Sequence, residues 1–187
     1  MLLTPFRYPP LRFGSRFGSV FERGLFYAST DVNTAATEKA FYRLFLAKGT
    51  KGKVGGRNIN YTSFESKILT NYGADLTKHP FTSFQDQISS KTAYQETQSL
   101  GSNLREAAVQ AFLAPCARTK TKSSNLNVFS PLAFDKNHNI QNTFEEWGCF
   151  YTKENVELYQ KKDPINTRLV FKDEDFSVNG KFPHPPS

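Results

Sequence analysis

Apolar residues are scattered along this chain, and only a few short stretches show a regular period. The clearest stretch covers residues 34–48, where Phe41, Leu44 and Phe45 fall on one face at helical spacing. Gly49 follows directly and is a residue type that commonly ends a helix. The pattern therefore predicts an α-helix over 34–48.

Local signals predict two more helices in the first two thirds of the chain. Residues 62–65 match the capping box that starts a helix, and the pattern continues to Gly73. Residues 102–114 have helical periodicity, and Pro115 would end that helix. Each of these helices is expected to be short.

The C-terminal third carries weaker signals. Residues 143–146 form another capping box, just before Trp147, and residues 153–160 fit one or two helical turns. Only residues 168–172, with the sequence RLVFK, read as a strand. The sequence thus predicts little β structure in this part of the chain.

Irregular stretches at 74–101 and 115–142 separate these elements. A compact domain rarely contains structureless loops of that length. We therefore predict a mainly irregular or extended chain with several short α-helices and little β structure, not a compact globular domain. The expected parts are an extended basic aromatic arm at 1–30, a short-helix region at 31–114 with a basic glycine-rich loop at 49–58, a linker at 115–142, and short helical and extended proline-rich segments at 143–187.

Composition supports this prediction. The chain has 18 Phe and 8 Tyr but only 8 Val and 5 Ile, and strand interiors draw heavily on Val and Ile. Scattered aromatic residues fit two interpretations. They either anchor the chain in the pockets of a partner or build a small aromatic-rich core.

The net charge is +7, and the positive charge lies in the first sixty residues and in a middle block at 91–122. A basic balance favours acidic partners, which include nucleic acid, anionic lipid and an acidic protein surface such as a microtubule. Charge alone does not discriminate between these partners.

The opening segment, residues 1–30, is rich in arginine and aromatic residues, and it has no acidic residue before Glu22. This composition is typical of a mitochondrial transit peptide, which acts as an amphipathic helix. Pro5, Pro9 and Pro10 disfavour a helix there, because proline lacks the amide donor and clashes with the preceding turn. We predict a binding arm, and an uncleaved targeting signal is the alternative.

No local motif indicates catalysis. The loop at 49–54 lacks the spacing of a phosphate-binding loop, the three histidines are isolated, and no G-x-S-x-G sequence occurs. Cys116 and Cys149 have no metal or redox spacing and read as reduced structural thiols. No apolar run approaches the length of a membrane span. We predict a protein that is not an enzyme and needs no cofactor or metal.

Two segments, 60–102 and 145–162, carry single aromatic residues spaced by Thr, Ser, Lys and Gln. In this spacing of single aromatic residues by polar ones, the chain resembles the small ciliary microtubule inner proteins, which lie along the lumen of doublet microtubules. The resemblance implies a non-enzymatic protein whose short helices and extended arms lie on tubulin and stabilise the lattice.

We therefore expect a structural protein that stabilises a large assembly with an acidic surface, foremost an axonemal doublet microtubule of the cilium. The alternative is an accessory structural subunit of a mitochondrial respiratory complex, ATP synthase or mitoribosome, where nucleic acid is a partner only within the ribosome. The predicted partner-binding residues are aromatic and basic: Phe6, Arg7, Tyr8, Arg12, Phe13, Arg16, Phe17, Lys48, Lys51, Lys53, Arg57 and Trp147.

Overall fold

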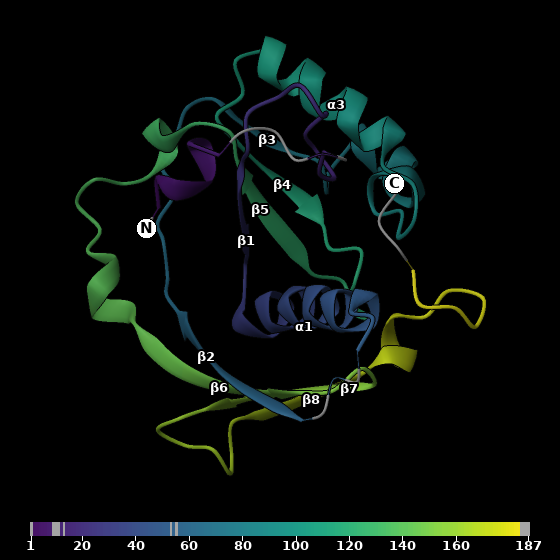
Figure 1. Cartoon of the computed structure of the whole chain (residues 1–187). Helices are drawn as coiled ribbons and strands as arrows, with labels where there is room; N and C mark the ends of the chain where they lie inside the picture. Colours follow the sequence, from purple (N-terminus) through teal and green to yellow (C-terminus); the bar gives the residue numbers. More distant parts are fainter. Residues whose placement is uncertain (1, 9–11, 13, 53, 55, 184–187) are drawn as a thin grey trace. The chain divides into compact units, whose positions relative to one another are not determined.

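The computed structural model describes residues 2–8, 12, 14–52, 54 and 56–183. Eight strands and three α-helices occur within these residues (Figure 1). The chain divides into two compact units. Unit 1 contains Met1–Thr30 and Lys67–Lys136, and unit 2 contains Asp31–Ser66 and Asn137–Pro183.

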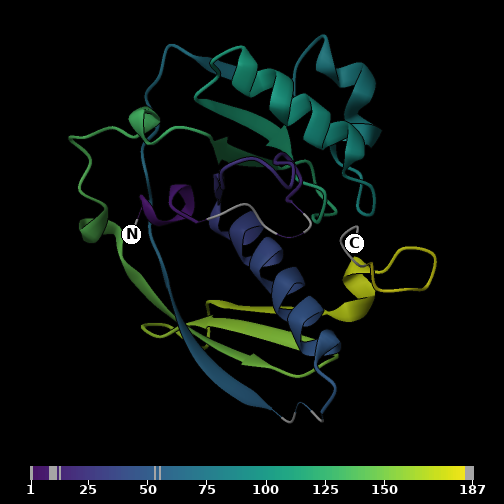
Figure 2. The ribbon, with the colours of Figure 1, turned by 45° about the horizontal axis from the view of Figure 1, so that its top comes forward.

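Unit 1 is built on a four-stranded sheet in the order β1-β5-β4-β3. Neighbouring strands are antiparallel except β3, which runs parallel to β4. Helix α3 lies across one face of this sheet (Figure 2). The elements are β1 (Phe26–Ser29), β3 (Gly73–Asp75), β4 (Ala111–Pro115), β5 (Ser124–Val128), α2 (Gln85–Ile88) and α3 (Gln95–Glu106).

Apolar clusters cover both faces of the unit 1 sheet. On the α3 face, the fully buried Phe17 packs edge-on against Phe112 of β4, with 4.9 Å between the ring centroids. On the other face, Phe134 packs edge-on against Phe26 of β1 and against Phe6. Aromatic pairs in this geometry gain energy beyond their buried area.

A close approach joins the segment before β1 to α3. A Cβ atom placed on Gly101 would lie 2.2 Å from the carbonyl oxygen of Phe17. No other residue type fits in that space, so Gly101 allows the backbone at Phe17 to lie directly against the helix.

Unit 2 is an antiparallel sheet in the order β2-β6-β7-β8 with helix α1 on one face (Figure 1). The elements are α1 (Val32–Gly49), β2 (Arg57–Ser63), β6 (Glu145–Tyr151), β7 (Asn155–Gln160) and β8 (Arg168–Lys172). Asp31 caps α1, because its carboxylate accepts a hydrogen bond from the Thr34 amide at 2.9 Å.

The core of unit 2 centres on Phe41 of α1. Its ring stacks on Phe182 at 5.2 Å and meets Phe176 edge-on at 5.6 Å. Buried Val156 and Leu158 of β7 belong to the same cluster. Aromatic rings from distant segments therefore supply much of this core.

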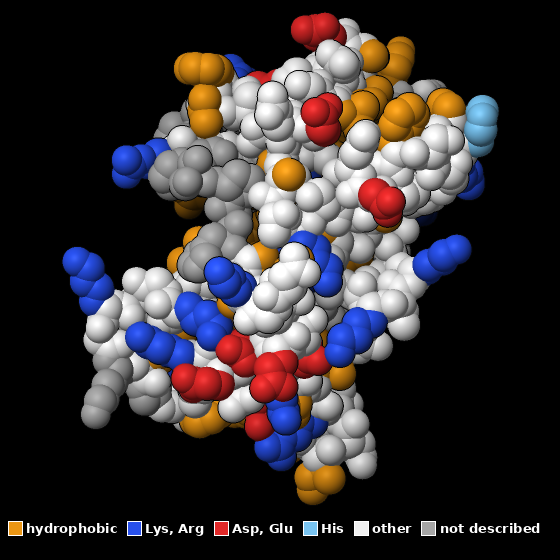
Figure 3. All heavy atoms as spheres, turned by 90° about the vertical axis from the view of Figure 1, so that its right-hand side faces the viewer, with side chains coloured by type: hydrophobic (Ala, Val, Ile, Leu, Met, Phe, Trp, Pro, Cys, Tyr) orange, Lys and Arg blue, Asp and Glu red, His pale blue; other side chains and the backbone are white. Residues whose placement is uncertain are grey.

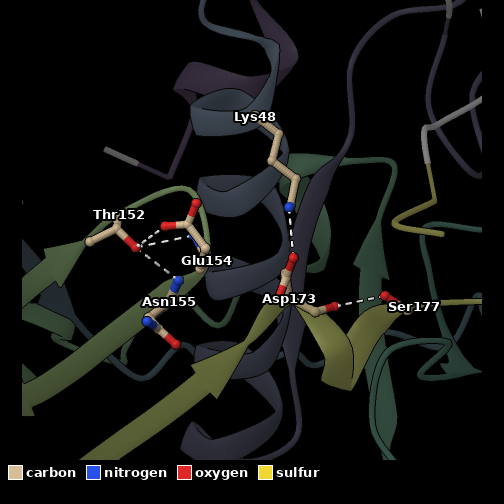
Figure 4. Close-up of polar contacts among 6 residues, drawn as sticks. All are labelled: Lys48, Thr152, Glu154, Asn155, Asp173 and Ser177. Carbon is tan, nitrogen blue, oxygen red and sulfur yellow. Dashed lines mark hydrogen bonds and ion pairs between the residues drawn. The ribbon is translucent and has the colours of Figure 1, made fainter. Parts of the chain in front are cut away.

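Polar contacts hold the end of α1 and the turns of this sheet (Figure 4). Lys48 of α1 forms an ion pair with Asp173 at 2.7 Å, and the backbone carbonyl of Asp173 accepts a hydrogen bond from Ser177. The hydroxyl of Thr152 accepts hydrogen bonds from the amides of Glu154 and Asn155, which shapes the turn between β6 and β7.

The predicted fold class is wrong. The chain forms two compact units that are each rich in sheet, and it is not mainly irregular or extended with little β structure. The prediction treated low Val and Ile content as a lack of core material. In the structure, Phe, Tyr, Leu and Ala fill the interior instead.

Individual elements were predicted with mixed success. The helix at 34–48 is confirmed as α1, and the strand at 168–172 is confirmed as β8. The helix at 102–114 is partly right, because α3 ends at Glu106 and β4 occupies Ala111–Pro115. The helix expected at 62–73 is wrong, because β2 and β3 take up its ends and no helix lies between them. The helical starts expected at 143–146 and 153–160 are wrong as well, since β6 and β7 occupy those stretches.

No helix in the described ranges combines the length and the apolar character needed to cross a membrane.

The contact at Gly101 gives a stability test. We expect Gly101→Ala to lower the free energy of unfolding by about 1 to 3 kcal/mol, because its Cβ would collide with rigid backbone at Phe17. Gly49→Ala is the matched control, since a Cβ at that position would meet no atom within 4 Å beyond its chain neighbours and the backbone of its own helix. The control should be neutral or stabilise by up to about 1 kcal/mol. Urea unfolding of both variants measures the difference, and equal stabilities would contradict the close approach.

Candidate functional site

Two of the predicted aromatic anchors lie inside unit 1. Phe17 is 1% exposed in the core beneath α3, and Phe6 is half-buried against Phe134. Tyr8 differs, because 63% of its surface is exposed. Phe13 lies outside the described residues.

Three predicted arginines belong to the same segment. Arg7 and Arg12 are exposed, whereas Arg16 is half-buried and points into unit 1. Arg16 is therefore held by its own chain.

The remaining predicted residues belong to unit 2. Lys48 pairs with Asp173, and Lys51 and Arg57 are exposed. Trp147 is buried and donates a hydrogen bond from Nε1 to Ser63 at 3.0 Å. Lys53 lies outside the described residues.

Arg16 is fixed by backbone carbonyls and an aromatic ring. Its Nη1 donates to the carbonyl oxygen of Ser90 at 2.6 Å and to that of Ile88 at 3.4 Å. The guanidinium lies over the ring of Tyr94, 4.6 Å from its centroid. These contacts orient the group, but each partner is formally neutral.

Tyr94 also contacts a second guanidinium. Arg118, which is only 4% exposed, donates from Nη2 to the Tyr94 hydroxyl at 2.9 Å and from Nη1 to the carbonyl of Lys91 at 3.1 Å. One tyrosine therefore lies between two arginines, with Arg16 on its ring and Arg118 at its hydroxyl.

Tyr27 of β1 brings a second phenol to this region. Its hydroxyl accepts a hydrogen bond from the Phe17 amide at 3.4 Å, while 45% of the side chain is exposed. Burial raises the pKa of Tyr27, and a hydrogen bond with Ser15 and the charge of Arg16 act in the opposite direction. Because the side chain is partly open, we assign this desolvation to the hydroxyl end, which lies against the Phe17 backbone.

Asn127 of β5 lies between Tyr27 and Phe112 in the strand register. Its side chain is 1% exposed, and neither amide atom has a hydrogen-bond partner among the described residues. A buried amide without partners costs about 1 to 3 kcal/mol. The group therefore has unused capacity to donate and to accept. Arg16, Tyr27, Tyr94, Arg118 and Asn127 are called the Arg16 cluster below.

A different cluster of cations lies on the helix-covered face of unit 2. The Nζ of Lys39 is 4.4 Å from the ring centroid of Tyr61, and Arg43 donates to the Tyr61 hydroxyl. Burial and the charge of Arg43 lower the pKa of Lys39. Burial also raises the pKa of the nearby Cys149 thiol to about 11. This thiol is protonated at neutral pH and is therefore a poor nucleophile or metal ligand there.

Both cysteines are buried, and they form no disulfide bond in the part of the chain that the structure describes. Across the part of the chain that the structure describes, no group of three or more His, Cys, Asp and Glu side chains is arranged to hold a metal ion. The Arg16 cluster offers donors, phenols and an amide instead, which suits an organic anion better than a cation.

Sequence reasoning found Arg16 and missed the other members of the cluster. Tyr94 was assigned to an irregular stretch, and Arg118 to a basic linker. Tyr27 and Asn127 carried no local signal, because only strand pairing brings them together.

A model of a protein family described as the RES domain matches residues 2–146. This range is more than half of the chain and contains every residue of the Arg16 cluster. No curated protein matches the sequence. The resemblance to microtubule inner proteins is not tested by the match and stays a prediction.

The pKa of Cys149 gives a test by pH. The folded-state pKa is raised from 9.0 to about 11, so the stability linked to the neutral thiol is fully present below pH 9 and is lost as pH rises through 11. We expect wild type to lose about 2 to 3 kcal/mol over this range through Cys149. Cys149→Ala should lack that part of the slope, although it is less stable at every pH. Parallel slopes for the two proteins, measured by urea unfolding, would contradict the assignment.

Proposed function

We propose that this chain, which belongs to the RES-domain family, binds in unit 1 a small molecule carrying an oxyanion, either phosphate or carboxylate. The range that matches the family spans the Arg16 cluster. The oxyanion binds at the guanidinium of Arg16. The exposed side chain of Tyr27 contacts the remainder of the molecule.

The observation that carries this proposal is the uncompensated charge of Arg16. Among the described residues, no carboxylate forms an ion pair with Arg16, and its hydrogen bonds go to the carbonyls of Ser90 and Ile88. A half-buried charge is costly unless it is paired. Arginine also presents several donors in a planar fork, which matches carboxylate and phosphate oxygens.

The surroundings of Arg16 support an anion rather than a neutral ligand. Arg118 adds a second positive charge on the other side of Tyr94, and like charges near one ring raise the local potential. Asn127 adds an amide without partners at the neighbouring position of Tyr27. Because both side chains are buried, they act on a bound anion through their charge and dipole and not by direct contact.

The proposal requires binding and includes no chemical step. That the protein is not an enzyme stays a prediction. The predictions of no cofactor and of a ciliary or mitochondrial location also remain untested.

Binding can be measured by thermal unfolding of the full chain with inorganic pyrophosphate or citrate as the phosphate and carboxylate probes. At a probe concentration 100 times Kd, we expect stabilisation by about 2.7 kcal/mol. Arg16→Gln should abolish this shift, because it removes the charge and the fork of donors. Arg23→Gln is the matched control, since Arg23 is an exposed arginine of the same segment.

The thermal unfolding experiment can either support or contradict the proposed site. A shift that is lost only in Arg16→Gln supports the site and identifies the preferred oxyanion. If neither probe stabilises wild type, or if Arg23→Gln loses the shift equally, the proposal is wrong.

A role on a large assembly remains a second candidate, because two aromatic residues of the opening segment lie on the surface. Phe21 is 92% exposed and Tyr8 is 63% exposed. Exposed aromatic residues are typical of protein interfaces. Lys, Arg, Asp and Glu side chains are mixed on the face shown in Figure 3, so that face carries no uniform basic patch.

Co-sedimentation with microtubules tests this second candidate. If the protein docks through exposed aromatic side chains, Phe21→Ser combined with Tyr8→Ser should reduce pelleting at least about fivefold, the loss of roughly 1 kcal/mol. Phe84→Ser is the control, because Phe84 is an exposed aromatic residue of another segment. Absence of pelleting by wild type would remove the microtubule from consideration.

A further inference from the structure

Strand β2 (Arg57–Ser63) is an edge of the unit 2 sheet. Of the described residues, only those of β6 pair with it along the strand. Figures 1 and 2 show β2 along the outside of the sheet. One row of its backbone N–H and C=O groups therefore lacks a neighbouring strand.

The two edge strands of this sheet differ in how well they are protected against pairing with a strand of another chain. Edge strands usually avoid pairing with other chains through proline, charged residues or bulges. The opposite edge, β8, begins with Arg168 and ends with Lys172. Strand β2 has the sequence RNINYTS, and Arg57 at its first position is its only charged residue.

We propose that two copies of this chain associate through β2, which pairs antiparallel with β2 of the second copy about Asn60. The two sheets then form one continuous sheet of eight strands. The proposal concerns unit 2 and is independent of the ligand proposed for unit 1.

The sequence of β2 is self-complementary in this register. Ile59 lies opposite Tyr61 of the second copy, and both residues already pack against the helix-covered core. Asn60 lies opposite Asn60, and Asn58 lies opposite Thr62, so polar side chains meet on the other face. Cross-strand pairs of these kinds stabilise sheets.

Charge also favours a second copy as the occupant. In this register Arg57 lies opposite Ser63, so the two Arg57 residues are about 20 Å apart along the strands. The charged residues of the two β2 strands are therefore kept apart, and Lys39 and Arg43, which contact Tyr61, belong to α1. Apart from Arg57, the strand presents no charge to an acidic or basic peptide, which argues against a strongly charged partner segment.

Analytical ultracentrifugation of the full chain over a wide range of concentrations measures the association. We expect a monomer–dimer equilibrium in wild type. Asn60→Lys places two lysines directly opposite each other and should weaken dimerisation at least about fivefold. Asn142→Lys is the matched control, because Asn142 is an exposed asparagine of unit 2 outside the sheet.

Cross-linking tests the register. Opposed side chains at Asn60 have Cβ atoms about 5 Å apart, so Asn60→Cys should give a covalent dimer with a short bis-maleimide. Asn142→Cys should not, and the native cysteines are buried. A monomer at every concentration overturns the proposal. Dimerisation that is unchanged in Asn60→Lys, or equal cross-linking of the two cysteine variants, also overturns it.

Discussion

The contact between Gly101 and the backbone of Phe17 is the constraint on which unit 1 depends. Because Gly101 has no side chain, the segment before β1 can lie directly on α3. This places the Phe17 ring in the core against Phe112 and its amide at the hydroxyl of Tyr27. The preceding residue, Arg16, is then directed to Ser90 and Tyr94. One close approach thus joins the packing of the unit to the geometry of its site.

Aromatic packing explains how a chain with few aliphatic residues forms two cores. Rings of Phe41, Phe176 and Phe182 meet in edge-on and stacked pairs in unit 2. Glycine makes room for other rings, since a Cβ on Gly148 would lie 2.2 Å from the ring of Tyr159. A count of Val and Ile cannot detect this, because the rings come from distant segments. The composition left an aromatic core open as an alternative, and that alternative is what the structure contains.

The elements that could be predicted are those whose signal is local. Helix α1 has its periodicity, its cap and its end within one stretch of sequence. The capping boxes at 62–65 and 143–146 wrongly predicted helices. In the structure these residues lie at the end of β2 and at the start of β6. The hydroxyl of Thr143 accepts a hydrogen bond from the amide of Glu65 at 2.9 Å, so the two expected helix starts contact each other where β2 and β6 pair. Pairing across the chain overrode the local preference.

The site was only partly predictable for the same reason. Arg16 was found because arginine alternates with aromatic residues in an opening segment that is unfit for a helix, but its partner was expected on another molecule. Its hydrogen bond to Ser90 instead spans 74 residues of the same chain. Arg118 was missed because charge alone predicts a solvent-exposed residue. What remains unexplained by folding is the charge itself, since carbonyls and a ring orient Arg16 without neutralising it. A half-buried charge that its own chain orients but does not neutralise is the feature on which the proposed oxyanion ligand rests.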